Sequence, residues 1–304
     1  MKKLDIDGVI VLNKPKGFTS VACLNKLKRR FKLKKIGHAG TLDPIAQGVL
    51  IVLLGQATKL APYLAEGKKT YRGKFTIGLE TDTFDKDGKI ISTYSWEHIS
   101  EDIIRAEVEG WVKWKEQLVP PYAAVKYKGR PFYSLAREGK DVPVVIKPVK
   151  IYKVEVLDIR LPDVEFRVEC SKGTYVRSLV HVTGKKLGCG AIVTELTREE
   201  SFPYNISQAV SLDEILEDFE IFKEKIIPLE DALPHWPKLF LNKKQSEAIK
   251  QGKWLDFNEI PSPYKEEGIK AIGLDYEKKP IALLETKYKN GKMYWSILRG
   301  LWKK

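Results

Sequence analysis

The chain has 304 residues, of which 43% are hydrophobic and 31% charged, and it carries a formal net charge of +13. This composition is typical of a globular protein with a sizeable core and excludes a disordered chain. No apolar run approaches the length of a membrane span, no secretion signal is visible, and three scattered cysteines predict reduced thiols rather than a disulfide framework or a zinc site. We therefore expect a cytoplasmic protein without a membrane association.

Positive charge is concentrated at the two ends of the chain. Residues 1–37 hold eleven Lys or Arg against two Asp, and residues 236–304 hold fifteen against eight acidic residues, whereas the middle is slightly acidic. Two basic surfaces suit a polyanion such as nucleic acid. A generally lysine-rich or thermophilic proteome would give similar totals, so charge alone does not decide.

The first elements are a short strand at 9–12 and a helix that begins at Thr19 or Ser20. The expected buried face of this helix consists of Val21, Leu24, Leu27 and Phe31. Its other face carries Lys26, Arg29 and Arg30, which are either solvated or in contact with phosphates.

The next stretch, residues 37–48, holds three glycines, His38, Asp43 and Pro44. We predict that it forms neither a helix nor a strand, because glycine adds backbone freedom and proline removes a donor. The apolar run at 49–54 that follows predicts a strand buried on both faces. Asp43 would therefore lie on a stiff loop between a basic surface and the core, although composition alone favours an ordinary turn residue.

The middle of the chain alternates between further predicted elements. We expect a helix at 57–66, a strand at 69–78 that carries Tyr71, and a tight turn at Asp87-Gly88. A helix starting at Ser100 or Glu101 would bury Ile103, Ile104, Val108 and Trp111. A loop rich in Tyr and Lys at 119–133 then leads into a helix end at 134–139.

Residues 149–170 predict two strands, and residues 171–179 predict a turn that opens a helix. This geometry could aim Tyr175 and Arg177 at one site, where an arginine could fix the direction of Asp43 by a two-point bond. A surface arginine without a partner is the alternative. An acidic helix at 211–222 follows. The last expected elements are a helix at 245–251 and three strands at 269–276, 281–288 and 293–298, with a hairpin turn at Asn290-Gly291.

Ordered motifs across residues 8–230 resemble the TruB family of tRNA pseudouridine synthases. Residues 37–48 fill every fixed position of G-H-x-G-T-L-D-P-x-A-x-G. The same order of motifs continues with the following stretches: Lys14-Pro15-x-Gly17, Lys69-x-Tyr71, Thr81-Asp82-Thr83-x-Asp85, Gly173-Thr174-Tyr175-x-Arg177 and Glu195-Leu196-Thr197-Arg198. Departures are Ala123, where the family has Ser, and Val182-Thr183, where it has an acidic residue and Leu.

The resemblance implies an α+β fold with a mixed, largely antiparallel central sheet flanked by helices, the pseudouridine synthase fold. A small C-terminal β-barrel would resemble a PUA domain. We accordingly expect a catalytic domain at 1–235 and a PUA-like RNA-binding domain at 236–304.

The implied activity is that of an isomerase which converts the T-loop uridine at position 55 of tRNA into pseudouridine. The base would be flipped out, and an aspartate-dependent rearrangement would replace the C–N glycosidic bond by a C–C bond. Attack on C1′, attack on C6 and an elimination route all stay open. We expect no metal and no other cofactor. The expected partner is the tRNA T-arm stem-loop, bound by a monomer without an obligatory protein partner.

The resemblance also implies roles for single residues. The catalytic set would be Asp43 as nucleophile, Tyr71 as stacking group and general base, and Arg177 as the ion-pair partner of Asp43. Five more residues would contact or orient the substrate: His38 as a wedge in the vacated stack, Lys14 as a structural or substrate-contacting cation, Asp85 as an orienting group, Tyr175 under the base and Leu196 over it.

Three other functions are compatible with parts of this pattern. A guide-RNA-dependent relative would need a partner complex. A non-catalytic RNA-binding or folding protein would not need the set of Asp43, Tyr71 and Arg177. A hydrolase of small glycosides would normally need paired carboxylates, which this sequence lacks.

Overall fold

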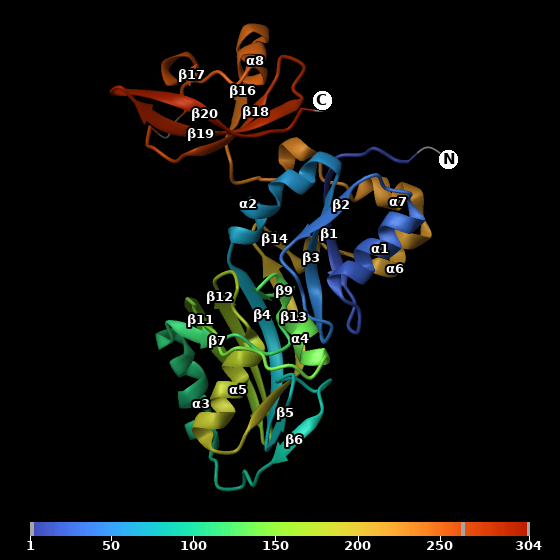
Figure 1. Cartoon of the computed structure of the whole chain (residues 1–304), viewed down its shortest axis with the longest axis vertical. Coiled ribbons are helices and arrows are strands. Elements are labelled where there is room, and N and C mark those ends of the chain that lie inside the picture. Colours follow the sequence, from blue (N-terminus) through green and yellow to red (C-terminus); the bar gives the residue numbers. More distant parts are fainter. Residues whose placement is uncertain (1–2, 263–264, 303–304) are drawn as a thin grey trace.

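The computed structural model describes residues 3–262 and 265–302. The outermost residues of the two predicted domains, 1–2 and 303–304, lie outside this range. Figure 1 shows an elongated molecule in which a large body carries a smaller C-terminal unit at one end.

A mixed sheet forms the body, and it contains nine strands in the described part of the chain. Its order is β11-β12-β4-β13-β3-β1-β15, with β14 on β13 and β2 on β3. Most neighbours are antiparallel, whereas β13 and β3, and β1 and β15, run parallel. This confirms the predicted α+β fold. The strands are β1 Gly8–Lys14, β2 Ile36–Ala39, β3 Ala46–Leu54, β4 Lys69–Ile77, β11 Ile151–Arg160, β12 Asp163–Cys170, β13 Ala191–Ser201, β14 Tyr204–Asn205 and β15 Val210–Ser211.

Helices α1, α3, α5, α6 and α7 pack on one face of this sheet, because the residues of their two apolar clusters lie on the same side of paired strands. One apolar cluster packs α1, α6 and α7 against β1 and β3, and another packs α3 and α5 against β4, β11, β12 and β13. The run 49–54 within β3 is fully buried, as predicted, because both of its faces are covered. The helices are α1 Ser20–Arg30, α2 Ala61–Glu66, α3 Glu101–Glu109, α4 Phe132–Arg137, α5 Val176–Leu187, α6 Leu212–Glu217, α7 Phe219–Glu224 and α8 Lys243–Lys250.

The stretch 37–48 is partly a strand, so the prediction that it contains no regular structure was wrong. Its first residues belong to β2 and its last to β3, and only residues 40–45 form the connecting loop. Strand β2 pairs antiparallel with the far half of β3, with His38 opposite Val52. That pairing supplies the backbone bonds that outweigh the local preference of glycine for irregular structure.

The buried faces of two helices differ from the prediction by one position. In α1, Cys23 occupies the core while Val21 is 56% exposed, and in α3, Ile104 is buried while Ile103 is 50% exposed. Arg30 in α1 donates to the carbonyl oxygens of Leu216 (2.9 Å) and Glu217 (3.3 Å). Its guanidinium therefore stabilises the end of α6, while Arg30 stays on the exposed face of α1 beside Lys26 and Arg29.

Two predicted helices are divided in the structure. The segment 57–66 is a 3-10 helix, Gly55–Leu60, followed by α2, and the segment 211–222 splits into α6 and α7. Asp218 separates the latter two in an extended conformation and its side chain accepts from the Glu220 amide, so it caps α7.

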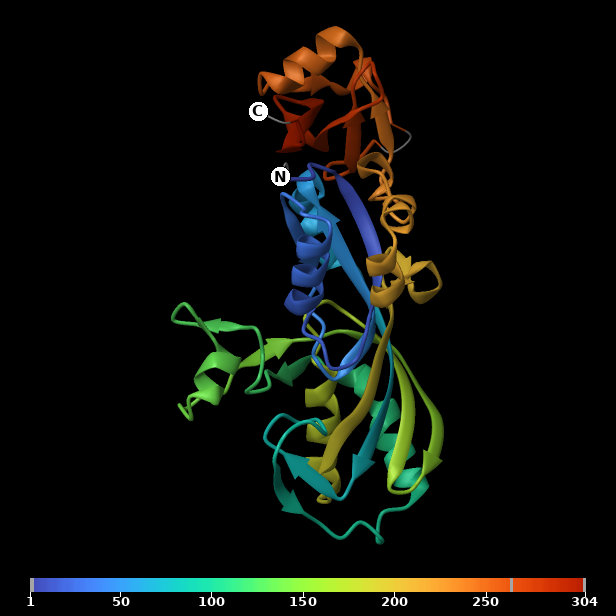
Figure 2. The same cartoon turned by 90° about the vertical axis from the view of Figure 1, so that its right-hand side faces the viewer.

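An insertion between α3 and β11 projects from the body, as Figure 2 shows for the green segment. Its small apolar cluster comprises Val119, Ala123 and Phe132. The predicted loop 119–133 contains a short hairpin, and α4 begins at Phe132 rather than at Ser134. The short strands here and beside it are β5 Leu79–Thr81, β6 Ile90–Thr93, β7 Glu116–Leu118, β8 Lys126–Tyr127, β9 Arg130–Pro131 and β10 Ile146–Pro148.

The C-terminal unit is a curled sheet of order β16-β18-β19-β20-β17 with α8 beside it, consistent with a PUA-like half-barrel. The predicted hairpin is present, since Asn290 and Gly291 both have positive φ between β19 and β20. Ile272, Leu283 and Leu301 join the apolar cluster of β1 and β3, so the unit packs directly on the body. The strands are β16 Lys238–Phe240, β17 Leu255–Asp256, β18 Lys270–Leu274, β19 Pro280–Lys289 and β20 Lys292–Gly300.

Candidate active site

The loop that carries Asp43 is held by a side chain at the start of α1. Ser20 Oγ donates to the Leu42 carbonyl (3.1 Å), and the Leu42 amide donates back to Ser20 Oγ (2.9 Å). Ser20 is buried. The residue before Asp43 is thereby fixed against the helix, which restricts where the carboxylate can point.

Arg198 in β13 also holds this loop. Its guanidinium donates to the carbonyl oxygens of Val49 (2.7 Å), Thr41 (3.2 Å) and Gly40 (3.3 Å). Strands β3 and β13 approach each other closely here. A Cβ on Gly48, which has a φ of +105°, would lie 2.3 Å from the Arg198 carbonyl oxygen. Glycine is therefore required at this position, and one buried arginine ties the start of the loop to the strand that follows it.

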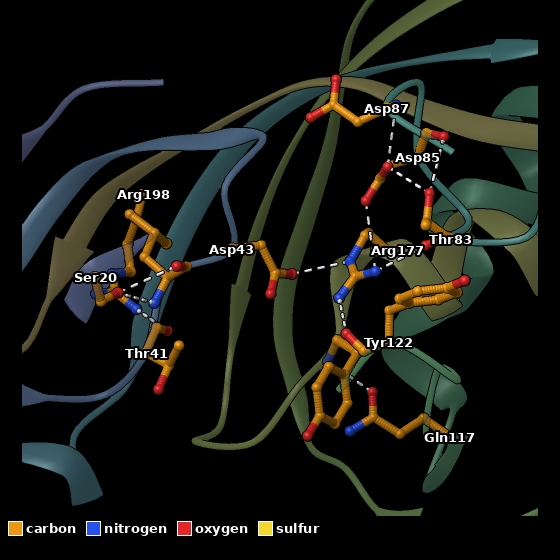
Figure 3. Close-up of polar contacts among 12 residues, drawn as sticks. Ser20, Thr41, Asp43, Thr83, Asp85, Asp87, Gln117, Tyr122, Arg177 and Arg198 are labelled. Atoms are coloured by element: carbon orange, nitrogen blue, oxygen red, sulfur yellow. Dashed lines mark hydrogen bonds and ion pairs between the residues drawn. The ribbon is translucent and has the colours of Figure 1, made fainter. Parts of the chain in front are cut away.

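Asp43 is paired with Arg177, which lies in the first turn of α5 (Figure 3). Arg177 Nε lies 2.9 Å from Asp43 Oδ2. Arg177 is 3% exposed, whereas the Asp43 side chain is 33% exposed, so the carboxylate alone reaches solvent. The predicted pairing is confirmed, but the expected two-point bond is not, because the contact uses a single oxygen of Asp43.

The remaining nitrogens of Arg177 serve other segments. One donates to the Thr83 carbonyl (2.7 Å) and lies 3.4 Å from Asp85 Oδ2, and the other donates to the Tyr122 carbonyl (3.1 Å). Asp85 is buried and accepts from Thr83 Oγ1 (2.6 Å). Burial raises the pKa of Asp85, while the positive charge of Arg177 opposes that rise. Asp85 thus contacts Arg177 rather than the open surface, which suits the predicted orienting role.

A hollow of about 490 Å³ opens beside Asp43. Four predicted site residues line it: Asp43, Tyr71, Tyr175 and Leu196. Burial raises the pKa of Tyr71, against the positive charge of Arg198, and burial together with the charge of Asp43 raises the pKa of Tyr175. Both phenols are therefore neutral at neutral pH. Two aromatic rings and an aliphatic side chain around a carboxylate make a compartment suited to one planar heterocycle.

Two predicted site residues lie elsewhere. Lys14 is fully buried and donates to the carbonyl oxygens of Pro15 (2.9 Å) and Phe18 (2.6 Å). Burial lowers the pKa of Lys14 to about 8. Of the two roles predicted for Lys14, these contacts fit the structural one, since its amine stabilises a turn. His38 lies half-buried on β2 and is not among the residues that line the hollow, so its wedge role stays a prediction.

The motifs assigned no role to Arg198 or Lys69, yet both line the hollow. The period of a strand could have found them, because Arg198 follows Leu196 by two positions and Lys69 precedes Tyr71 by two, which places each pair on one face. A cation on the inward face of a buried strand is costly unless it is bonded, and this is the signal for a functional or structural role.

At 182–183, where this chain departs from the family pattern, the structure shows contacts that hold the neighbouring segments. Thr183 is buried and its Oγ1 accepts from Trp111 Nε1 (2.8 Å). The ring of His181 stacks on Phe84, with centroids 3.7 Å apart and planes 9° from parallel. Phe84 directly follows Thr83, so this stack holds the segment whose carbonyl binds Arg177. The second departure, Ala123, is buried in the cluster of the insertion.

Within residues 3–262 and 265–302, no group of three or more His, Cys, Asp or Glu side chains is arranged to hold a metal ion. No helix in these ranges is long and apolar enough to cross a membrane.

Two family models match the chain. The TruB family pseudouridylate synthase N-terminal domain matches residues 28–176, and the tRNA pseudouridylate synthase B C-terminal domain matches residues 177–234. A protein named tRNA pseudouridine synthase B from Oleidesulfovibrio alaskensis is 50% identical over 97% of this chain and 96% of its own length. A protein of the same name from Nitratidesulfovibrio vulgaris strain Miyazaki F is 47% identical, with the same coverage.

Solved structures show the same arrangement over nearly the whole chain. The structure of an H/ACA RNP bound to a substrate RNA containing 2′-deoxyuridine aligns with a TM-score of 0.71 and 25% identity, covering 97% of this chain and 85% of that one. A Cbf5-Nop10-Gar1 complex aligns with a TM-score of 0.72 and 26% identity, with the same coverage.

Proposed function

Because this chain belongs to the TruB family of pseudouridine synthases, we propose that it isomerises the T-loop uridine at position 55 of tRNA to pseudouridine. Membership makes it an isomerase. The observation that carries the proposal is that Asp43, which pairs with Arg177 at 2.9 Å, lies on the wall of a hollow that two tyrosines also line.

The reaction requires a bond exchange at one sugar carbon. The bond from C1′ to N1 breaks, the bond from C1′ to C5 forms, C5 loses its hydrogen and N1 ends with a proton. Asp43 starts the exchange, and attack on C1′, attack on C6 and elimination all require the same carboxylate beside the sugar and base. Arg177 holds one oxygen of this carboxylate, which leaves the group oriented toward the hollow.

The base must leave its stack to reach this carboxylate. We assign Tyr71 and Tyr175 to stacking on the flipped base and Leu196 to covering it, since all three line the hollow. Tyr71 would also take the proton from C5. The neutral phenol would first give its own proton to N1 of the released base, which ends the reaction protonated, and the nearby positive charge of Arg198 favours that loss.

The two structural units suggest a division of labour. We assign catalysis to residues 1–235 and RNA binding to the PUA-like unit at 236–304, whose fifteen Lys or Arg exceed its eight acidic residues. The enzyme would bind the T-arm stem-loop as a monomer, without a guide RNA or an obligatory protein partner. The RNP neighbours make a guide-dependent activity the competing function, and a purified chain acting on a bare stem-loop would separate the two.

The test is tritium release from a T-arm stem-loop that carries 5-tritiated uridine at the target position. Wild-type protein should release tritium without a partner, and Asp43→Asn should release none above background while binding the stem-loop within about threefold of wild type. Asp158→Asn is the matched control, because Asp158 is exposed on β11 and pairs with Arg160. Release by Asp43→Asn at the wild-type rate would refute the assignment.

A further inference from the structure

The turn between β12 and α5 carries Tyr175 to the wall of the hollow but makes few bonds of its own. The Ser171 carbonyl accepts from the amide (3.4 Å) and the hydroxyl (2.8 Å) of Thr174. Gly173 has a φ of +77°, which a turn of this kind requires. The Gly173 carbonyl and the Tyr175 amide are left to a side chain from another segment.

That side chain is Gln117, in strand β7 of the insertion (Figure 3). Gln117 Nε2 donates to the Gly173 carbonyl (2.7 Å), and the Tyr175 amide donates to Gln117 Oε1 (2.8 Å). Gln117 is only 5% exposed. A buried primary amide that satisfies one acceptor and one donor of a neighbouring backbone replaces the pairing that a strand would supply.

We propose that Gln117 is a positioning residue for the base-binding wall. By bridging Gly173 and Tyr175, it fixes the Tyr175 ring relative to Asp43, and it sets the start of the helix whose second residue is Arg177. This inference rests on the proposed function for the identity of the bound base. Tyr122 of the same insertion accepts from Arg177, so the insertion supports both the aromatic wall and the arginine.

Gln117 should affect the rate of the enzyme but not its affinity for the stem-loop. Affinity for the stem-loop depends on many phosphate contacts distributed over the surface. The rate depends on whether the flipped base lies at the correct height beside Asp43, and small misplacements are costly for rates. Loss of the Gln117 amide should therefore lower the single-turnover rate and leave the dissociation constant nearly unchanged.

Gln117→Met tests this, because methionine has a similar length and cannot form either bond. We expect the single-turnover rate of tritium release to fall about 10- to 100-fold and the stem-loop dissociation constant to stay within about threefold. Gln208→Met is the matched control: Gln208 also accepts from a backbone amide, that of Asn205 (3.0 Å), in an exposed turn outside the hollow.

Gln117→Glu should make the rate depend on pH, which a residue that only stabilises the fold would not do. A protonated carboxyl offers one acceptor and one donor and can form both bonds, whereas a carboxylate loses the donor and faces the Gly173 carbonyl with a negative charge. Burial favours the protonated form. The rate of Gln117→Glu relative to wild type should therefore be near one at pH 5.5 and fall at least tenfold by pH 8.

Amide hydrogen exchange of the segment 171–176 provides a test that needs no activity. Gln117→Met should accelerate exchange at the Tyr175 amide at least tenfold, with exchange in the centre of β13 unchanged. Inactive wild-type protein would count against the proposed function. Unchanged exchange at the Tyr175 amide in Gln117→Met would separately count against the bridging role of Gln117. With active wild type, a Gln117→Met rate equal to wild type or a pH-independent Gln117→Glu ratio would overturn the inference.

Discussion

Arg177 is the residue on which the site converges. Its three nitrogens reach Asp43, Thr83 and Tyr122, which lie in three separate segments. A planar guanidinium can serve three directions at once, whereas a lysine amine is a point charge on a flexible stem. The arginine therefore fixes the geometry of the carboxylate in addition to neutralising its charge.

Arg177→Lys should lower the rate of tritium release by about two orders of magnitude, because the charge remains but the fork is lost. Single-turnover kinetics at saturating stem-loop would measure this. Arg160→Lys, on the exposed side of β11, should leave the rate unchanged. A rate within threefold of wild type for Arg177→Lys would show that charge alone suffices.

At the scale of elements, Lys69 joins the end of α2 to the start of β4. Its Nζ donates to the carbonyl oxygens of Ala65 (2.6 Å) and Gly67. Lys69 is buried, and burial, assisted by the charge of Arg198, lowers the pKa of Lys69 to about 8. The bonds that hold the helix end persist in the neutral amine, whereas the charged form is destabilised.

This difference predicts a pH dependence of stability. Between pH 8 and the ordinary lysine pKa of 10.5, the unfolded chain binds the proton that the folded chain has lost, so the contribution of Lys69 to the free energy of unfolding rises with pH. The wild-type free energy of unfolding minus that of Lys69→Met should increase by on the order of 1–3 kcal/mol from pH 8 to pH 10.

Denaturant unfolding at several pH values measures this difference. Lys68→Met is the matched control, because the neighbouring Lys68 is exposed and pairs with Glu169, and its difference should not increase over the same range. If the difference in free energy of unfolding between wild type and Lys69→Met does not change with pH, the Lys69 amine has the same pKa in the folded and the unfolded chain.

The whole molecule presents its two basic ends on one packed body. The C-terminal unit shares an apolar cluster with β1 and β3, and Lys59 of the body donates to the Gly300 carbonyl (2.7 Å). The exposed face of α1 carries Lys26 and Arg29 beside Arg30, which bonds the end of α6. A folded RNA would therefore meet basic surfaces held together by this packing.

Binding of the stem-loop should weaken steeply with salt, because each neutralised phosphate releases counterions. For wild type we expect at least a 100-fold loss of affinity between about 50 and 200 mM salt. In the double variant Lys26→Gln, Arg29→Gln, the slope of log affinity against log salt should be smaller in magnitude by about 1 to 2. Lys153→Gln, on β11 beside Glu155, should keep the wild-type slope. A flat wild-type profile would argue against phosphate contacts.

The amino-acid sequence by itself determined the family, the order of most elements and the residues that we propose carry the chemistry. Asp43, Tyr71 and Arg177 were predicted from motifs, and the first two line one hollow while the third pairs with Asp43. Such predictions succeed because a motif and a strand or helix period are local: they specify which residue types stand on one face at one end of an element.

Only the tertiary structure decided how each polar group is satisfied. The hydrogen-bond partners of Arg177 lie 134, 94 and 55 residues away, and its nitrogens are divided among them instead of forming the expected two-point bond with Asp43. The burial of Lys14 and the bridge made by Gln117 depend in the same way on distant backbone groups. A spacing indicates which side of an element a side chain occupies, but the fold alone determines which remote donor or acceptor is brought against it.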